Sequence, residues 1–181
     1  EQLKPYLNRS TGLPSNEVRA IITASDNSVW YATAQGVVKQ APDGELFHFN
    51  EDNGLPAHFS MGLAEDREGR IWIATGIGLA YIQQGVVHIV KFPENSDAQH
   101  AFSFSVVENG TWITTDRGLA YFDNTTQALS VIEKSQGLPV DKLFSIGIDH
   151  NSGVWLSSNQ GVILTSLSSL EKCLTHSSAL L

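Results

Sequence analysis

Residues 54–79 read GLPAHFSMGLAEDREGRIWIATGIGL, and this stretch decides the fold because the chain repeats its landmarks. The tryptophan recurs at intervals of 42, 40 and 43 residues, at Trp30, Trp72, Trp112 and Trp155. A glycine follows each at a nearly constant offset: Gly36, Gly78, Gly118 and Gly161. The triplet Gly-Leu-Pro begins at Gly12, Gly54 and Gly137, and one copy has been lost near 96–97. Three independent markers in one register indicate four tandem repeats.

Each repeat is predicted to form four short strands. In the first, β-branched and aromatic runs at 18–22, 29–33, 37–39 and 46–49 are separated by turns rich in Asn, Asp, Gly and Pro. No segment between the turns spaces apolar residues as a helix does, so no helix is expected. Four antiparallel strands in roughly 40–45 residues are typical of a β-propeller blade. The sequence therefore predicts an all-β propeller, with blades at about 16–49, 59–91, 101–132 and 142–176.

The first and last segments of the chain are predicted separately from the four repeats. Residues 170–176 are expected to form the rim strand of the fourth blade. Residues 1–8 resemble the rim segment 45–49 and are expected to be the last strand of a preceding blade. Propellers have about four to eight blades, so four blades form either a small closed ring or an arc.

The repeat landmarks have mechanical interpretations. Tryptophan is bulky and apolar, which suits it to fill the wedge between neighbouring blades. In Gly-Leu-Pro, glycine permits a turn with positive φ and proline cannot extend a ladder. The leucine between them is predicted to plug the gap between blades.

Composition excludes several classes of partner. The 181 residues are 41% hydrophobic and 17% charged, with a net charge of −8, as in an acidic globular domain. A nucleic acid or an anionic membrane surface needs a basic face, so neither is expected. The single cysteine, Cys173, rules out an internal disulfide. Because the chain opens with Glu1 and carries no signal peptide, we expect a mature chain or an excised fragment.

The second repeat resembles the two-component regulator propeller repeat, and the other copies do so more loosely. The matching residues are Gly54-Leu55-Pro56, Asp66, Gly69, Ile71-Trp72-Ile73-Ala74-Thr75 and Gly78-Leu79, then Trp112-Ile113-Thr114-Thr115 and Gly118-Leu119, and finally Gly137-Leu138-Pro139 and Gly153-Val154-Trp155. The resemblance implies the periplasmic sensor region of a bacterial inner-membrane receptor. It also implies seven blades, so that this chain would be an arc of a larger ring. Members typically continue into a β-sandwich, a membrane helix and a histidine kinase or diguanylate cyclase.

Catalytic and metal-binding motifs are missing from the sequence. It has no Gly-x-Ser-x-Gly, His-Glu-x-x-His, phosphate loop or dinucleotide fingerprint. The six histidines show no ligand spacing, and the acidic turns lack a calcium-loop pattern. We therefore expect no enzymatic activity, no metal and no cofactor in this segment.

A candidate ligand site follows from propeller geometry. The first strand of each blade lines the central channel, so the connector and the turn after the second strand emerge on one face. The polar residues expected around this mouth are Asn16, His58, His100, Asp141, Gln35, Arg117 and Gln160. Converging polar side chains of this kind suit a small solute such as an oligosaccharide.

Three functions remain open from the sequence. The first is a sensor module that binds a solute and works with the remaining blades and downstream domains of its receptor. The second is a propeller enzyme, such as a polysaccharide lyase or glycosidase, although paired carboxylates are not visible at matched positions. The third is a scaffold for another protein. An arc would also expose the flat faces of its end blades, so self-association is expected.

Overall fold

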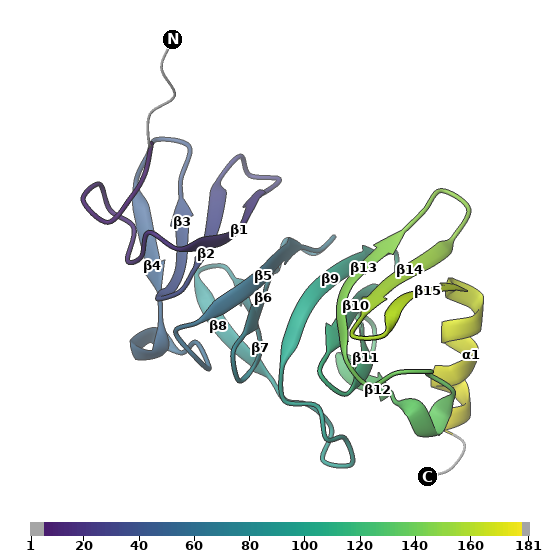
Figure 1. Ribbon diagram of the computed structural model, residues 1–181. Helices are drawn as coiled ribbons and strands as arrows, with labels where there is room; N and C mark the ends of the chain where they lie inside the picture. The colour runs from purple at the N-terminus through teal and green to yellow at the C-terminus, as the bar shows by residue number, and fades with distance from the viewer. Residues whose placement is uncertain (1–5, 179–181) are drawn as a thin grey trace.

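The computed structural model describes residues 6–178 and contains four antiparallel sheets in chain order (Figure 1). The first sheet holds β1 (Val18–Thr23), β2 (Val29–Thr33), β3 (Gly36–Gln40) and β4 (Leu46–Phe49). The second holds β5 (Ser60–Glu65), β6 (Ile71–Thr75), β7 (Gly78–Gln83) and β8 (Val86–Val90). The third holds β9 (Ala101–Val107), β10 (Gly110–Thr115), β11 (Gly118–Asp123) and β12 (Ala128–Ile132). The fourth holds β13 (Leu143–Ile148), β14 (Gly153–Ser158) and β15 (Gly161–Ser166).

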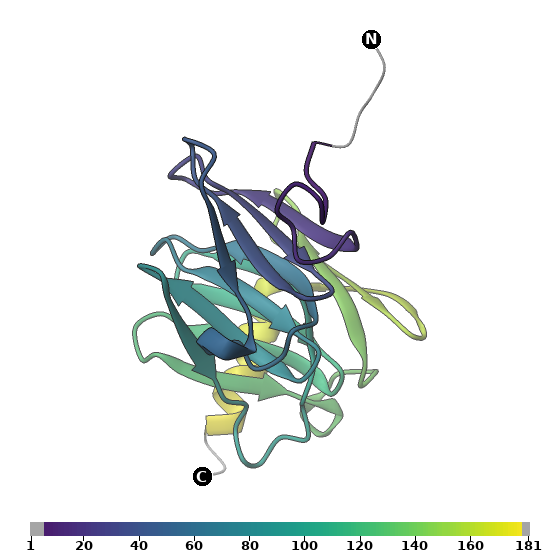
Figure 2. The same ribbon diagram turned by 90° about the vertical axis from the view of Figure 1, so that its left-hand side faces the viewer.

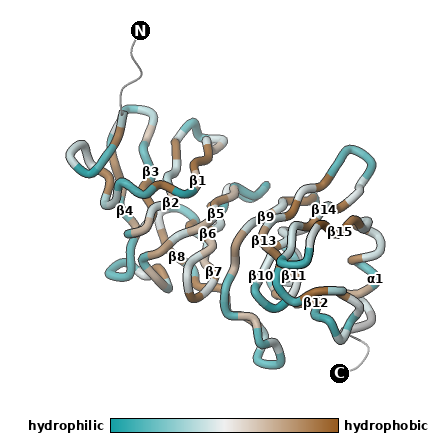
Figure 3. Tube along the Cα trace, in the orientation of Figure 1, coloured by the Kyte–Doolittle hydropathy of each residue, from teal (hydrophilic) through white to brown (hydrophobic). Residues whose placement is uncertain are grey.

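The sheets are arranged as propeller blades. Within each sheet the strands follow sequence order, so hairpins join all neighbours. The first strands β1, β5, β9 and β13 contact one another in turn, as the inner strands of a propeller do (Figure 1). Viewed from the side, the first sheet lies nearest the viewer and the others stack behind it (Figure 2). Hydrophobic segments run through the strands and hydrophilic ones through many of the turns (Figure 3). The all-β propeller prediction is confirmed.

The prediction of a rim strand at 170–176 is wrong, and so is the expectation that the chain has no helix. This segment belongs to the helix α1 (Leu167–Ser178), so the fourth sheet has three strands. Leu167, Leu170 and Leu174 recur at helical spacing, and all three pack against the core of the third and fourth sheets. The Ser166 hydroxyl accepts a hydrogen bond from the Ser169 amide at 3.2 Å, which caps the first turn.

The strand expected at 1–8 falls mostly outside the described residues, because the structure describes nothing before Tyr6. Residues 6–8 are described and contain no strand. Two 3₁₀-helices, η1 (Glu51–Asn53) and η2 (Lys134–Gln136), lead into the second and fourth sheets.

The connector Gly-Leu-Pro works as the sequence suggested. Its glycines adopt positive φ values of 125°, 107° and 108° at Gly12, Gly54 and Gly137. The leucine that follows each glycine is buried. Leu55 joins the apolar cluster between the first two sheets, and Leu138 the cluster between the last two. The connector leucine therefore plugs the gap between blades.

The repeated tryptophan fills the wedge between one sheet and the next. Trp30 packs in a cluster with Ile71 and Ile73 of the second sheet. Trp72 does the same with Ile113 and Phe122 of the third. Trp112 packs with side chains of the fourth, including Val154 and Leu156. These three tryptophans are at most 4% exposed, whereas Trp155 is 47% exposed, because no further sheet follows its own among the described residues.

In the first, second and fourth sheets, the turn before the tryptophan strand holds the indole in place. The Trp72 Nε1–H donates to the Asp66 carboxylate at 2.7 Å, and Trp155 donates to Asp149 at 3.0 Å. In the first sheet Trp30 donates to the Ser28 hydroxyl at 2.9 Å, which donates in turn to Asp26. The indole of Trp155, helped by backbone amides, holds the pKa of Asp149 below its ordinary value.

Arg70 joins the second sheet to the third from a fully buried position. Its Nε donates to Asp66 at 2.5 Å, and its two terminal nitrogens donate to Asn124 and Gln127 of the third sheet. The guanidinium carbon also lies 5.1 Å from the centroid of the Phe122 ring. A planar cation with several donors and a flat face suits such a site better than lysine would.

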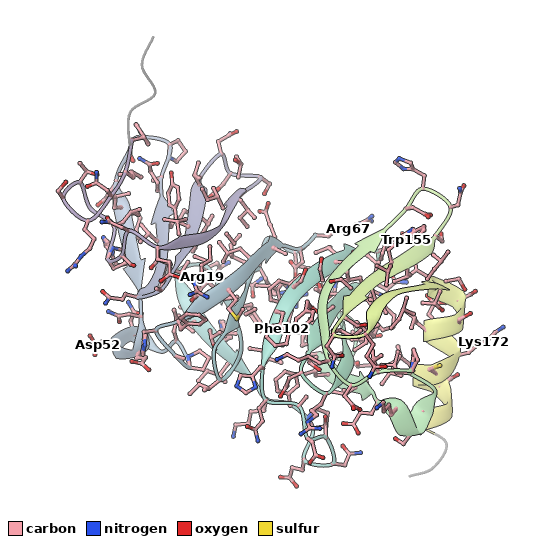
Figure 4. All side chains as sticks on the ribbon, viewed as in Figure 1. Arg19, Asp52, Arg67, Phe102, Trp155 and Lys172 are labelled. Atoms are coloured by element: carbon pink, nitrogen blue, oxygen red, sulfur yellow. The ribbon has the colours of Figure 1, made fainter. Side chains whose placement is uncertain are left out.

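Replacing Arg70 should therefore destabilise the fold severely. In Arg70→Met the buried Asp66 carboxylate loses its cation, and breaking a buried pair in this way costs about 3–5 kcal/mol. Urea unfolding followed by tryptophan fluorescence measures the loss. Arg67→Met is the matched control, since Arg67 is exposed at the tip of the same turn (Figure 4) and should change stability little. Equal losses in the two variants would contradict this account.

Candidate functional site

The four inner strands share an irregularity that the repeat pattern did not predict. In each, the pairing register with the second strand shifts by one residue near the strand's start. The extra residue is therefore left without a cross-strand partner, as in a β-bulge. The residues at this position are Arg19, Met61, Phe102 and Phe144. Bulges change the direction of side chains, and here they recur on all four inner strands.

Close packing of the inner strands brings these side chains near one another. A Cβ atom on Gly62 of β5 would lie only 2.5 Å from the carbonyl oxygen of Phe102 in β9. Glycine at this position thus allows the two strands to approach. In Figure 4, Arg19 and Phe102 both lie along the line of the first strands.

Cations and aromatic rings lie next to one another at the start of these strands. The Arg19 guanidinium lies 3.7 Å from the centroid of the Phe59 ring and also pairs with Glu17. The Lys142 ammonium lies 5.5 Å from the rings of both Phe102 and Phe144. Those two rings are 6.0 Å apart in an edge-to-face arrangement. We call Arg19, Phe59, Met61, Phe102, Lys142 and Phe144 the channel row.

The predicted mouth residues lie next to this row. In the first three blades the turn after the second strand donates a backbone hydrogen bond to the residue just before the inner strand, with Glu17, Phe59 and His100 as acceptors. Connector and turn therefore meet at the same edge of each blade. Asn16, His58, Gln35, Arg117 and Gln160 are exposed there, while His100 and Asp141 are half-buried.

Each connector residue at the mouth is held by its own loop. Asn16 accepts a hydrogen bond from the Arg9 amide at 2.8 Å. His58 lies 3.4 Å from Glu51, and Asp141 lies 2.9 Å from Lys134. Among residues 6–178 no hydrogen bond or ion pair joins any two of the seven predicted residues. They share an edge without forming a network.

His100 stands one position out of register with the other connector residues. Asn16, His58 and Asp141 each precede their inner strand by two residues, and the third blade has Gln99 at that place. His100 corresponds instead to Glu17, Phe59 and Lys142. The loss of Gly-Leu-Pro from this connector removed the marker by which the sequence could be aligned.

The His100 side chain forms the most developed polar contact at the mouth. Its Nδ1 lies 3.1 Å from the Asp116 carboxylate, which also accepts the backbone amides of Gln99 and His100. Burial alone would raise the pKa of Asp116, but these amides and the imidazole together hold it below the ordinary value. The carboxylate fixes the third connector in the absence of its Gly-Leu-Pro.

A cavity lies between the first two blades, at the far end of the inner strand β5 from the mouth residues. This cavity of about 310 Å³ is lined by both polar and aromatic groups, including Asp26, Trp30, Lys39, Phe47, Phe49 and Glu65. Between the second and third blades Arg70 fills the equivalent space, whereas the first blade has Ser28 at that position. The Ser28 and Lys39 side chains hydrogen-bond to Asp26 and lower its pKa to about 2.

Within residues 6–178 no group of three or more His, Cys, Asp or Glu side chains is placed to hold a metal ion. None of the helices in the same range has the length and apolar character needed to cross a membrane.

The comparisons with known proteins agree with this geometry. The family profile of the two component regulator propeller matches residues 54–76. The resemblance seen in the sequence is confirmed. The matched residues include the connector Gly54-Leu55-Pro56 and Trp72, which are two of the three landmarks of the repeat. No curated protein matches the sequence.

Solved structures of similar fold include extracellular domains of two component systems and a lyase. The chain is similar to the extracellular domain of a protein from B. thetaiotaomicron described as a hybrid two component system, with a TM-score of 0.80 and 22% identity over 92% of this chain and 24% of that one. A second such domain from B. thetaiotaomicron has a TM-score of 0.70 and 26% identity over 86% of this chain and 22% of that one. Virginiamycin B lyase from Staphylococcus aureus has a TM-score of 0.65 and 15% identity over 86% of this chain and 58% of that one. The chain spans about a quarter of the length of the first two.

The contact between His100 and Asp116 predicts how stability changes with acid. A carboxylate whose folded pKa lies below 3.8 adds stability above that pH, and this stability is lost as the pH falls through the lowered value. Unfolding free energies at pH 7 and pH 3 should therefore differ less in Asp116→Asn than in the natural chain. An equal or larger drop in the variant would contradict the role given to Asp116.

Proposed function

We propose that this chain is the ligand-recognition part of a periplasmic sensor propeller in a bacterial signalling receptor. The family match and the likeness to extracellular domains of two-component systems support a sensor role. The remaining blades of a seven-bladed ring, and a downstream histidine kinase or diguanylate cyclase, would be supplied by the rest of such a receptor.

The channel row is the observation that carries the proposal. Aromatic rings offer flat apolar faces to a solute, and cations held over rings remain available to polar groups on it. Phe59, Phe102 and Phe144 come from three different blades, so a solute here would touch several blades at once. A solute that contacts several blades would couple its binding to the way those blades pack against one another. An oligosaccharide, which has apolar ring faces and polar edges, fits this chemistry.

The mouth residues would complete the site with hydrogen bonds. Asn16, His58 and Asp141, with the turn residues Gln35, Arg117 and Gln160, lie beside the channel row at the same edge of their blades. Small polar sites combine an apolar surface with a few oriented polar groups, and this edge offers both.

An enzyme is the second candidate, because virginiamycin B lyase has a similar fold. At 15% identity that likeness concerns the fold alone. The polar groups at the mouth are tied to their own loops, as Asn16 is to the Arg9 amide and Asp141 to Lys134. Such separately held groups favour recognition over coordinated acid–base chemistry.

The sensor assignment predicts that the purified chain has no turnover. Incubation with a panel of neutral and acidic polysaccharides should release no sugar ends and no unsaturated products. Sustained release that His58→Ala or His100→Ala abolishes would establish the enzyme instead.

Binding at the mouth should depend on mouth residues and not on the rim. With the oligosaccharide that raises the melting temperature most in a thermal-shift screen, Asn16→Ala, His58→Ala and His100→Ala should each reduce the shift by half or more. The unliganded melting temperatures of Asn16→Ala and His58→Ala should stay within about 2 °C, since both side chains are exposed. His100→Ala also removes the imidazole from Asp116 and should lower the unliganded melting temperature further. The rim variants His48→Ala and Lys91→Ala are the controls and should keep the full shift. Equal effects at mouth and rim would reject this site.

A screen in which no sugar raises the melting temperature would point to the third function, a scaffold for another protein. A ligand that binds the native state must stabilise it, so the absence of any shift has a direct meaning.

A further inference from the structure

The cavity between the first two blades has an apolar floor and a charged opening. The floor is made of five buried side chains: Ala24, Trp30, Phe49, Ile71 and Ile82. The polar side chains that line the cavity are all at least partly exposed: Asp26, Lys39, Glu65 and Gln84. Figure 4 labels Arg67 on the turn between β5 and β6, and Gly69 of that turn borders the cavity as well. The volume of about 310 Å³ is at the lower end of the range for small-ligand sites.

Between the second and third blades the chain itself fills the equivalent space. There the Arg70 guanidinium pairs with the carboxylates of Asp66 and Glu68, at 2.5 and 3.2 Å. Its carbon lies 5.6 Å from the centroid of the Trp72 ring. The side-chain oxygen of Asn124, on the third blade, accepts a further hydrogen bond from it at 2.5 Å. One planar cation thus joins two blades through carboxylates, an indole and a side-chain amide.

The first gap keeps most of the groups that hold this guanidinium. Trp30 takes the position of the indole and Asp26 that of the second carboxylate, each 42 residues earlier in the repeat. Gln84 is the first residue after β7, as the amide acceptor in the next gap is the first residue after β11. The position of the arginine itself holds Ser28, whose short side chain cannot reach across the gap. The groups that receive a guanidinium are therefore present without the guanidinium.

A carboxylate from the second blade compensates for one that the first blade lacks. Ala24 takes the position of the main carboxylate partner of the arginine, and Glu65 of β5 lines the cavity from the other side. Glu65 accepts hydrogen bonds from the amide and the hydroxyl of Ser25 at 2.7 and 2.6 Å. These two bonds use about half of the acceptor sites of a carboxylate. Two carboxylates and one ammonium line the cavity, so the site carries a net negative charge.

The ammonium of Lys39 supplies a cation but does not fill the cavity. It lies 2.9 Å from Asp26 and 5.6 Å from the centroid of the Trp30 ring. The Ser28 and Lys39 side chains hold the pKa of Asp26 at about 2, so this carboxylate is ionised at neutral pH. In residues 6–178 no ion pair joins Lys39 to Glu65. A compact ammonium does not provide the flat face and the several donors of a guanidinium.

We propose that this cavity binds a solute that carries a guanidinium group, such as arginine. The bound guanidinium faces the Trp30 indole and donates hydrogen bonds to Glu65 and to the side-chain oxygen of Gln84. The alkyl chain of the solute covers the ring of Phe47, which is 43% exposed at the edge of the cavity. The solute thus joins the first blade to the second. Because the cavity and the mouth lie at opposite ends of β5, the inference does not depend on an oligosaccharide site at the mouth.

Calorimetric titration of the 181-residue chain tests the chemistry of the ligand. Arginine or its blocked form, acetyl-arginine amide, should bind at one site per chain, and the preference between them distinguishes the free amino acid from an arginine within a peptide. Citrulline has the shape of arginine without the charge, and lysine has the charge without the planar group. Both should bind at least about tenfold more weakly. Equal affinity for citrulline or lysine, or no binding of either arginine form at millimolar concentration, would overturn the proposal.

A variant that fills the cavity tests the position of the site. Ala24→Asp combined with Ser28→Arg rebuilds in the first blade the pair that Arg70 forms in the second. This double variant should melt cooperatively, because the second blade folds with the same residues at these positions, and it should no longer bind arginine. Unchanged affinity in the folded variant would place the binding elsewhere and overturn the proposal.

A second variant keeps the test decisive if the double variant does not fold. Glu65→Gln removes one charge from the cavity and keeps the shape of the side chain. It should weaken arginine binding by about tenfold or more, since a charge-assisted hydrogen bond is lost. Glu45→Gln is the control, because Glu45 is an exposed carboxylate outside the cavity, and it should leave the affinity unchanged. Equal affinities in the two variants would contradict the assignment.

Discussion

The insertion of one tryptophan from each blade into the next is the interaction on which the structure depends. Trp30, Trp72 and Trp112 are almost completely buried against a neighbouring sheet, and losing such a side chain typically costs about 3–5 kcal/mol. The indole must point across the gap between sheets for this packing to form. For Trp30 and Trp72 the preceding turn supplies the acceptor that fixes the indole, Ser28 in the first sheet and Asp66 in the second. One side chain per repeat thus sets the spacing of the blades.

This spacing decides what the inner strands can offer to a ligand. Once the wedges are filled, β5 and β9 lie so close that Gly62 has no room for a side chain. Side chains of the inner strands alternate toward the two neighbouring blades, and little would remain to face the channel. The bulge near the start of each strand changes this, because its extra residue has no place in the alternation. Phe102 and Phe144 meet edge to face for this reason.

Features that recur with the repeat landmarks could be predicted from the sequence. Features at positions where a landmark is missing or the residue type varies could not. Landmarks kept in register predicted the strands, the connector leucines and the buried tryptophans. They could not predict the bulges, which leave no marker when the extra residue varies from Arg19 to Met61 to Phe102. The displaced alignment of His100 has a related cause, the missing Gly-Leu-Pro. The helix α1 lies beyond the last landmark, where the expectation of a fourth strand outweighed the helical spacing of Leu167, Leu170 and Leu174. Arg70 was missed because its partners Asn124 and Gln127 are more than fifty residues away.

Each blade presents its tryptophan on one face and receives the tryptophan of the preceding blade on the other face. An array of such blades therefore has a direction, and its last blade leaves a tryptophan that no sheet receives. Each blade covers the tryptophan of the blade before it but leaves its own tryptophan to be covered by the next. In the described residues the tryptophan left without a covering sheet is Trp155. A helix beside the last sheet does not remove this requirement, since α1 packs with Leu138 and Leu156 on the opposite side. A closed ring is the one arrangement in which every tryptophan of the array packs against a neighbouring sheet. It is also the arrangement that turns a row of inner strands into a channel, so the packing rule that builds the fold is the same rule that completes the candidate site.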